Sequence, residues 1–309
     1  MRKGRLRGWL SCLVALMLCC AVSFAAAEEQ GISYVENEYN YVDGSMDLSK
    51  GLPSVVSGVL DRILRRGVLR VATEPFFAPQ EFIDPDLSGQ EQYVGADMEM
   101  ARMIAQRLGV ELEIVPMEFN EVLPSVSEDQ CDLAISALSY TPSRAAANTM
   151  SKGYYFTGGA MNSGVIIRAE DQEKITSIKD LADKVIIAQS GSLQEAMLGE
   201  KVTAYKEFRR VSTIQTVYEA VSGGKVDAGA VDVASASAYI RNNPQSGLVL
   251  VEGISFALQE AYQGDRIAAK KDELQLMYFV NAVIDEILEK DLYNQWIDTW
   301  SVRAAELGL

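Results

Sequence analysis

The stretch Asp132-Leu-Ala-Ile-Ser-Ala-Leu-Ser-Tyr-Thr-Pro-Ser-Arg144 decides the fold of this 309-residue chain. Its apolar start predicts a buried strand over 132–137, and the hydroxyl-rich turn that follows predicts the start of a helix. Ser136, Ser139 and Arg144 therefore lie at the carboxyl end of a strand, where open α/β sheets bind ligands. Because a guanidinium grips both oxygens of a carboxylate, the pattern favours a carboxylate site. The alternative is an ordinary strand–turn–helix with a surface arginine.

Strands and helices alternate on both sides of this stretch. Such alternation is typical of parallel sheets with helices on both faces. Two similar units in succession predict an α/β fold of two lobes, each a mostly parallel sheet flanked by helices, with a ligand cleft between them. The predicted strands span 68–72, 111–115, 132–137, 164–168, 185–188, 226–231, 248–251 and 266–269, and the last two helices span about 272–289 and 291–303.

The N-terminus has the pattern of an export signal. Residues 1–27 combine a basic start, an apolar run and the small residues Ala25-Ala26-Ala27, as secretory signal peptides do. The signal predicts an exported chain, in the periplasm or on the outer face of the cytoplasmic membrane, and lipidation at Cys19 or Cys20 stays open. Residues 28–57 are a polar arm, expected to be mobile or loosely packed, and the apolar spacing predicts a helix over 54–66.

The composition excludes several classes of protein. The chain contains no histidine, which is the commonest general base and zinc ligand, so we expect neither an enzyme nor a cofactor or metal site. The formal net charge of −15 argues against nucleic acid and anionic membrane surfaces as partners. After the signal only Cys131 remains, so the exported chain has no internal disulfide. No later segment is apolar enough to span a membrane.

Six short motifs follow one another along the chain. Over about residues 58–303 they resemble the extracellular solute-binding protein of an amino-acid (polar or basic) ABC importer, solute-binding protein family 3, which has the type II periplasmic binding fold. The resemblance implies a first lobe over 58–162, a second lobe over 163–252 and a return to the first lobe over 253–309, joined by two crossover strands. The motifs are Gly67–Thr73, Phe77–Pro79, Gly95–Gly109, Asp132–Arg144, Gly191–Glu195 and Val226–Asp232.

The resemblance also implies how the two ends of an amino acid would be held. Arg144, with the backbone around Ser139, would grip the α-carboxylate from the first lobe. Gly191 and Ser192 would add N–H donors from the second lobe, so that the ligand is held from both sides. Asp232 would accept hydrogen bonds from the α-ammonium.

The same resemblance assigns the walls of the pocket. Phe77 and Phe119 would sandwich the ligand side chain, and Ala137 would contribute backbone contacts. Glu74 stands where some members that bind cationic amino acids keep an acid. The chain departs from the family pattern at Leu193, where a second Thr or Ser is common, and this departure leaves one carboxylate contact open.

Three functions follow from these observations. The first is a monomeric binding component that closes on a free amino acid and delivers it to a membrane permease with its ATPase. The second is an enzyme of the same fold, such as a cyclohexadienyl dehydratase, with Glu74 or Glu81 as general acid. The third is a ligand-sensing module that docks on a receptor. The sequence does not specify the amino acid, although Glu74 and the acidic charge favour a cationic or polar one.

Overall fold

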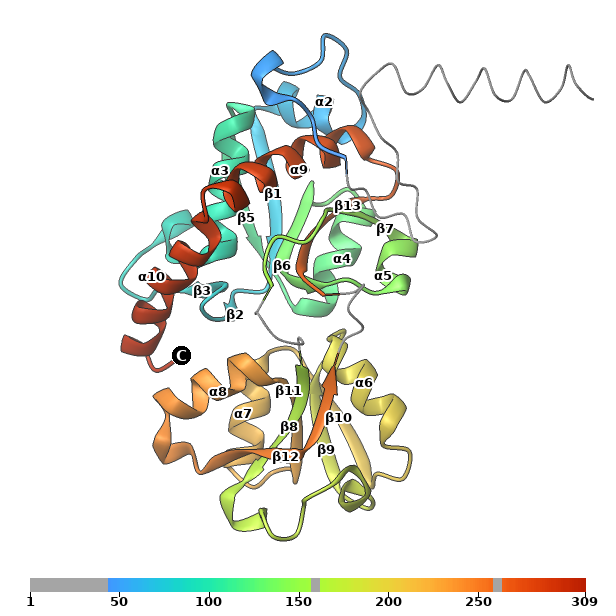
Figure 1. The fold of residues 1–309 in the computed structure, drawn as a ribbon, viewed down its shortest axis with the longest axis vertical. Helices are drawn as coiled ribbons and strands as arrows, with labels where there is room; N and C mark the ends of the chain where they lie inside the picture. Colours follow the sequence, from blue (N-terminus) through green and yellow to red (C-terminus); the bar gives the residue numbers. More distant parts are fainter. Residues whose placement is uncertain (1–43, 157–161, 258–262) are drawn as a thin grey trace, which may run out of the picture.

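The computed structural model describes residues 44–156, 162–257 and 263–309. Within them the chain forms two lobes, each built around one five-stranded sheet (Figure 1). The predicted signal peptide and residues 28–43 of the predicted arm lie outside the described residues. Among the residues that the structure describes, no helix has the length and apolar character needed to cross a membrane.

The sheet of the first lobe has the strand order β5-β1-β6-β13-β7. Strands β5, β1 and β6 run parallel, and β13 is antiparallel to both of its neighbours. Side chains alternate between the two faces, because successive residues of a strand point to opposite sides: Leu69 and Val71 pack into one core, whereas Ala72 packs into another. The strands are β1 (Val68–Thr73), β5 (Glu111–Pro116), β6 (Leu133–Ser139), β7 (Asn148–Met150) and β13 (Asp265–Lys270).

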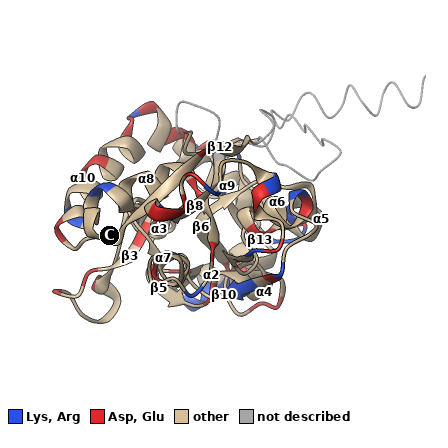
Figure 2. Ribbon diagram, turned by 90° about the horizontal axis from the view of Figure 1, so that it is seen from below, with Lys and Arg blue, Asp and Glu red and all other residues tan. Residues whose placement is uncertain are grey.

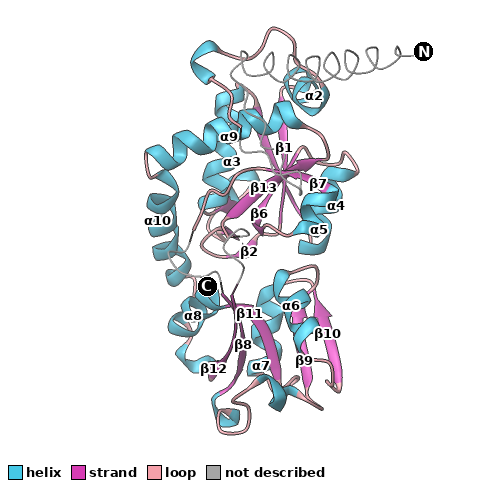
Figure 3. Ribbon diagram, turned by 45° about the vertical axis from the view of Figure 1, so that its right-hand side comes forward, coloured by secondary structure: helices cyan, strands magenta, loops and turns pink. Residues whose placement is uncertain are grey.

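Helices cover both faces of this sheet. Helices α2, α3 and α9 contribute apolar residues to the larger core, and α4 and α5 contribute to the smaller core on the opposite face. The last helix, α10, runs from the end of α9 toward the second lobe (Figure 3). These helices are α2 (Gly58–Arg66), α3 (Ala96–Leu108), α4 (Phe119–Ser127), α5 (Pro142–Ala147), α9 (Leu274–Glu289) and α10 (Leu292–Glu306).

The second lobe repeats this plan with the strand order β10-β9-β11-β8-β12. Strands β10, β9 and β11 are parallel, and β8 is antiparallel to β11 and β12. Ile166 and its neighbours Val165 and Ile167 face opposite cores, so this sheet too is buried on both sides. The elements are β8 (Asn162–Arg168), β9 (Val185–Gln189), β10 (Glu207–Val211), β11 (Ala228–Asp232), β12 (Leu248–Ala257), α6 (Leu193–Lys201), α7 (Ile214–Ser222) and α8 (Val233–Asn242).

The two lobes confirm the predicted α/β fold with mostly parallel sheets, and several smaller elements were not predicted. A three-stranded sheet, β2-β3-β4, lies beside the first lobe and buries Phe82 against α10. Ser177 is the N-cap of a single 3₁₀ turn. The unpredicted strands are β2 (Phe76–Phe77), β3 (Glu81–Ile83) and β4 (Tyr93–Val94), together with β7 and β10 of the two main sheets, and the 3₁₀ helices span Leu48–Lys50, Gly89–Gln92, Ala169–Asp171, Ile178–Leu181 and Pro244–Ser246.

Residues 44–57 form a strap along α9, so this part of the predicted arm packs on the surface of the first lobe. The Met46 N–H donates to the Tyr278 carbonyl at 2.9 Å, and the Ser57 N–H donates to the Gln275 side chain at 3.0 Å. Leu48, Leu52 and Val56 pack on the larger core. Because these contacts hold 54–57 in a non-helical path, α2 begins at Gly58 and not at Ser54 as predicted.

The lobes touch one another through hydrogen bonds. On the first-lobe side of the crossing, the two chain segments that connect the lobes are bonded to each other, because the Asp265 N–H donates to the Tyr155 carbonyl at 3.0 Å. The Ser212 hydroxyl of the second lobe donates to Glu118 of the first at 2.7 Å. At the end of α10, the side-chain amides of Asn242 and Asn243 donate to the carbonyls of Leu309 and Gly308 at 2.6 and 2.7 Å. The conformation described is therefore one in which the two lobes are in contact.

Candidate functional site

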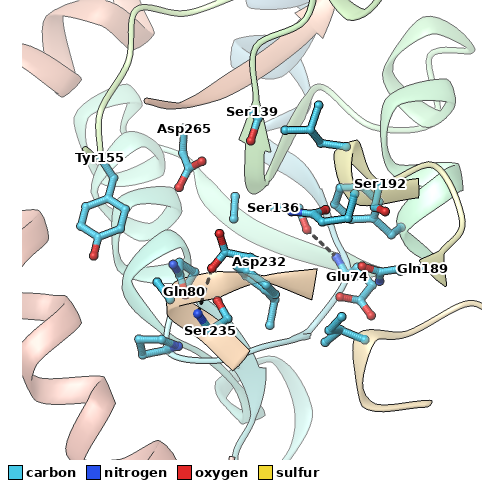
Figure 4. Close-up of a pocket in the computed structure, with 18 of the residues that line it drawn as sticks. Glu74, Gln80, Ser136, Ser139, Tyr155, Gln189, Ser192, Asp232, Ser235 and Asp265 are labelled. Atoms are coloured by element: carbon cyan, nitrogen blue, oxygen red, sulfur yellow. Dashed lines mark hydrogen bonds between the residues drawn. The ribbon is translucent and has the colours of Figure 1, made fainter. Parts of the chain in front are cut away.

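A cavity of about 270 Å³ lies between the two lobes. Figure 4 shows side chains from both lobes directed into it. The structure brings together all of the predicted site residues at this cavity except Gly191, which lies beside it. The predicted residues that line the cavity are Glu74, Phe77, Phe119, Ser136, Ala137, Ser139, Arg144, Ser192 and Asp232.

Arg144 is held in place at the start of α5. The Thr141 hydroxyl caps this helix by accepting from the Arg144 N–H at 3.1 Å. One guanidinium nitrogen donates to the Ser139 carbonyl at 2.8 Å, and another donates across the lobes to the Gly191 carbonyl at 3.1 Å. The guanidinium also lies over the Phe119 ring, 5.7 Å from its centroid. Burial lowers the pKa of Arg144 to about 10, so the group stays charged at neutral pH.

The turn at Gly191 and Ser192 is organised around Glu195. The Gly191 N–H donates to the Glu195 carboxylate at 2.7 Å, and the Ser192 hydroxyl accepts from the Glu195 N–H at 3.0 Å. These bonds explain why Gly191 contributes its carbonyl to Arg144 and does not line the cavity. Its φ of +76° favours glycine. Ser192, Leu193 and Gln194, at the start of α6, form the wall of the cavity on this side.

Asp232 has two roles in the structure. It is the N-cap of α8, where its carboxylate accepts from the Ser235 N–H at 2.8 Å. It also lines the cavity, and Figure 4 shows it directed into the same space as Asp265. Burial raises the pKa of Asp232, and the bonds to Ser235 and Ala234 oppose that rise.

Glu74 is a buried carboxyl directly after β1, with 1% of its surface exposed. Its N–H donates to the Ser136 hydroxyl at 3.1 Å, and that hydroxyl donates to Glu81 at 2.9 Å, so the Ser136 side chain is committed to the protein. Burial raises the pKa of Glu74 to about 7, and a hydrogen bond with the Gln189 side chain opposes that rise. The Glu74 Oε1 atom has no hydrogen-bond partner among the described residues. Glu74 therefore presents an unsatisfied acceptor to the cavity.

Ala137 sits in a left-handed conformation, with φ of 43°, at the end of the strand that opens the site. Its N–H donates to the Asp97 carboxylate at 2.8 Å. Asp97 also accepts from the Tyr154 and Tyr293 hydroxyls at 3.0 and 2.6 Å. The N-cap of α3 is Gly95, and Asp97 is buried within the first turn of this helix. Asp97 thus fixes the backbone of the binding segment.

Sequence reasoning missed several residues that line the cavity. Tyr155 lies at the cavity as well as at the crossing between the lobes. Gln189 ends β9 and faces Glu74 (Figure 4). Asp265 begins β13, and because charged Arg266 follows it and Lys270 ends the strand, the local sequence does not distinguish this acid from a surface residue. These positions come from segments far apart in the chain, so no single motif contains them.

The family model of bacterial extracellular solute-binding proteins, family 3, matches residues 69–303. The chain is 27% identical over 207 residues to the "Arginine-binding extracellular protein ArtP" of Bacillus subtilis. The matched region covers 66% of this chain and 74% of that protein. The chain is also 25% identical over 236 residues to the "L-cystine-binding protein TcyJ" of Escherichia coli, and the matched region covers 76% of this chain and 82% of that protein.

A solved structure gives the same result. The amino acid ABC transporter substrate-binding protein AbpA from Streptococcus pneumoniae, bound to L-arginine, superposes with a TM-score of 0.70 at 32% identity. The match covers 79% of this chain and 98% of that one. The family model matches most of the chain, and the two lobes with a cavity between them agree with that match. The chain therefore belongs to the family of bacterial extracellular solute-binding proteins, family 3.

Proposed function

We propose that this chain binds a cationic amino acid between its lobes and delivers it to the permease of an ABC importer. One observation carries the proposal: the cavity between the lobes holds a charged guanidinium, Arg144, and a carboxylate, Asp232, in the same space. An amino acid head group presents a carboxylate and an ammonium, which match these two charges. The contact from Arg144 to the Gly191 carbonyl spans the lobes, so a ligand held by Arg144 would favour the closed state.

The other residues of the cavity favour a cationic side chain on that amino acid. Phe77 and Phe119 supply apolar faces, on which a cation or an aliphatic chain packs. Glu74 is buried, and one of its oxygens has no partner. A buried acceptor without a partner is costly, and a guanidinium or ammonium from the ligand would satisfy it. The proteins ArtP and AbpA, which bind arginine, agree with this assignment.

The same family supports the remaining parts of the proposal. We infer that residues 1–27 direct export, that the protein works in the periplasm or on the outer face of the membrane as a monomer, and that it is not an enzyme. Basic and acidic side chains are spread over several elements of both lobes, as Figure 2 shows. This distribution agrees with a partner that is a small molecule and not a polyanion.

A thermal-shift panel of the twenty amino acids tests the proposal. A ligand at 100 times its Kd stabilises the folded state by about 2.7 kcal/mol, which for a chain of this size raises Tm by roughly 5–10 °C. We expect arginine or lysine to give the largest rise and Arg144→Ala to abolish it. The control is Arg65→Ala, which removes an exposed arginine whose side chain is 79% accessible on α2. A flat panel contradicts the proposal.

The enzyme alternative meets an electrostatic obstacle. A carboxyl with a pKa near 7, such as Glu74, would suit a general acid. Glu81 accepts a bond from Ser136 and does not line the cavity, so it is poorly placed for that role. Prephenate carries two carboxylates. The acids that line the cavity, Glu74, Asp232 and Asp265, would repel both of them. We therefore expect no turnover of prephenate or arogenate by the purified protein, and measured turnover would restore the alternative.

A further inference from the structure

Asp265 is a buried acid at the cavity that the family comparison does not explain. It lines the cavity with 2% of its surface exposed, and its Oδ1 atom has no hydrogen-bond partner among the described residues. Its backbone is fixed on both sides, because its N–H donates to the Tyr155 carbonyl and its carbonyl accepts from the Tyr154 N–H at 2.9 Å. Figure 4 shows its carboxyl directed toward Asp232. A rigidly held acid with an unpaired oxygen is a ready acceptor for a ligand.

The charges around Asp265 come from both sides of the strand. Within the cavity it faces Arg144, which attracts it, and Asp232, which repels it; behind the cavity Asp97 repels it and Arg266 attracts it. Arg266 follows Asp265 in β13 and therefore points to the other face of the sheet. There it donates to the Ser151 carbonyl at 2.9 Å and lies over Tyr140. Arg266 does not line the cavity, so a ligand meets Asp265 without it.

The charges that line the cavity do not match a zwitterion. Arg144, Asp232 and Asp265 form what we call the head-group end, and their formal charges sum to a single negative charge. A zwitterionic amino acid head has no net charge and leaves this negative charge uncompensated, whereas an ammonium without a carboxylate neutralises it. Arg241 also lines the cavity, but its side chain is exposed and screened by solvent. Glu74, whose pKa burial raises to about 7, adds further negative charge at the other end when it is ionised.

We propose that Asp265 extends the ligand range of this cavity to linear dications without a carboxylate, namely diamines and guanidinoalkylamines, alongside cationic amino acids. In such a complex Asp265 stays ionised, takes the place of the ligand carboxylate opposite Arg144, and shares the ammonium with Asp232. When an amino acid binds, Asp265 carries a proton. Burial and the neighbouring acids Asp97 and Asp232 raise the pKa of Asp265 well above its usual range, which favours the protonated form when no ligand cation lies beside the group. The inference rests on the proposed function.

Isothermal titration of the purified full chain with L-arginine and with agmatine, its decarboxylated form, tests the inference. We expect wild-type protein to bind agmatine within about tenfold of arginine. Asp265→Asn mimics the protonated acid, so it should leave the Kd for arginine within about threefold while weakening agmatine by about tenfold or more, as expected for loss of a charged hydrogen bond. The preference between the two ligands should therefore shift toward arginine.

Two variants serve as controls. Asp232→Asn removes the negative charge that the ammonium groups of both ligands share and should weaken both. Asp298→Asn makes the same change of charge at an exposed position of α10 and should weaken neither. Wild-type binding of arginine with agmatine more than about a hundredfold weaker overturns the inference and leaves the proposed function standing, and this arm needs no variant to fold. Equal weakening of both ligands by Asp265→Asn also overturns it. Binding of neither ligand contradicts the proposed function itself.

Discussion

Asp97 offers a quantitative test of how the binding segment is held. Asp97→Ala removes the acceptor for three donors, the Ala137 N–H and the Tyr154 and Tyr293 hydroxyls, and each buried donor left unpaired costs about 1–3 kcal/mol. The sum is about 3–9 kcal/mol. The lower part of that range is expected, because the variant also removes the repulsion between Asp97 and the buried Glu81. A loss of about 3–5 kcal/mol is a large part of the stability of a typical domain.

Urea unfolding of the ligand-free protein at pH 7, followed by circular dichroism, measures this loss. Asp97→Asn is the matched control, since it keeps the size and one oxygen acceptor, and should cost about 1–2 kcal/mol. Ala137→Gly should be neutral or stabilising by up to about 1 kcal/mol, because glycine adopts the φ of 43° without strain. In combination with Asp97→Ala it should recover part of the loss. A loss below about 1 kcal/mol for Asp97→Ala would refute the reasoning.

Three further predictions concern pH, packing and the ligand. Burial raises the pKa of Glu74 from 4.5 to about 7 in the folded protein, so protonation of Glu74 contributes its full stabilisation below pH 4.5, and this stabilisation is lost as the pH rises through 7. The free energy of unfolding should therefore fall by about 3 kcal/mol over this range. A Glu74→Gln variant whose free energy of unfolding depends on pH as steeply as that of the wild type would disprove the assignment. In Gly95→Ala, at a φ of 119°, the new Cβ would lie 2.2 Å from the Gln80 carbonyl oxygen, whereas in Gly109→Ala the space around the new Cβ is open. The Tm of Gly95→Ala should therefore drop by several degrees more than that of Gly109→Ala. Equal drops in Tm would count against this steric explanation. Arg144→Lys keeps the charge but cannot reach both carbonyls, so the Kd for arginine, measured by titration calorimetry, should rise by about tenfold to a hundredfold, and an unchanged Kd would exclude a fork-shaped contact.

The elements with strong apolar periodicity were predictable, and the weak ones were not. Strand β6 is buried along almost its whole length and is apolar apart from two serines, and β1 departs from an apolar run only at Arg70 and Thr73. By contrast, β10 has the sequence Glu-Phe-Arg-Arg-Val, because it is an edge strand with half of its residues in water. The start of α2 was misplaced because residues 54–57 have helical spacing, but contacts with α9, more than 200 residues away, hold them in another path.

Some residues of the candidate site were also predictable from local sequence, and others were not. Arg144, Ser192 and Asp232 each stand at a strand end or a helix start, where local sequence indicates an exposed polar position. Asp265 and Gln189 reach the cavity only because β13 pairs with β6 and because the lobes meet. Pairing between strands so distant along the chain leaves no local trace in one sequence. The structure therefore adds the residues that decide which charges a ligand must carry.

The bonds from Asn242 and Asn243 to the carbonyls of residues 308–309 make the end of α10 a natural position for a reporter. These bonds join the lobes, so any change in the angle between them alters the surroundings of the last turn of α10. Cys131 is the one cysteine among the described residues, and it is buried. A cysteine introduced at the exposed Ala305 would therefore be the preferred site for a thiol-reactive fluorophore. Its emission would follow opening and closing in solution, which would turn this chain into an optical sensor for its own ligand.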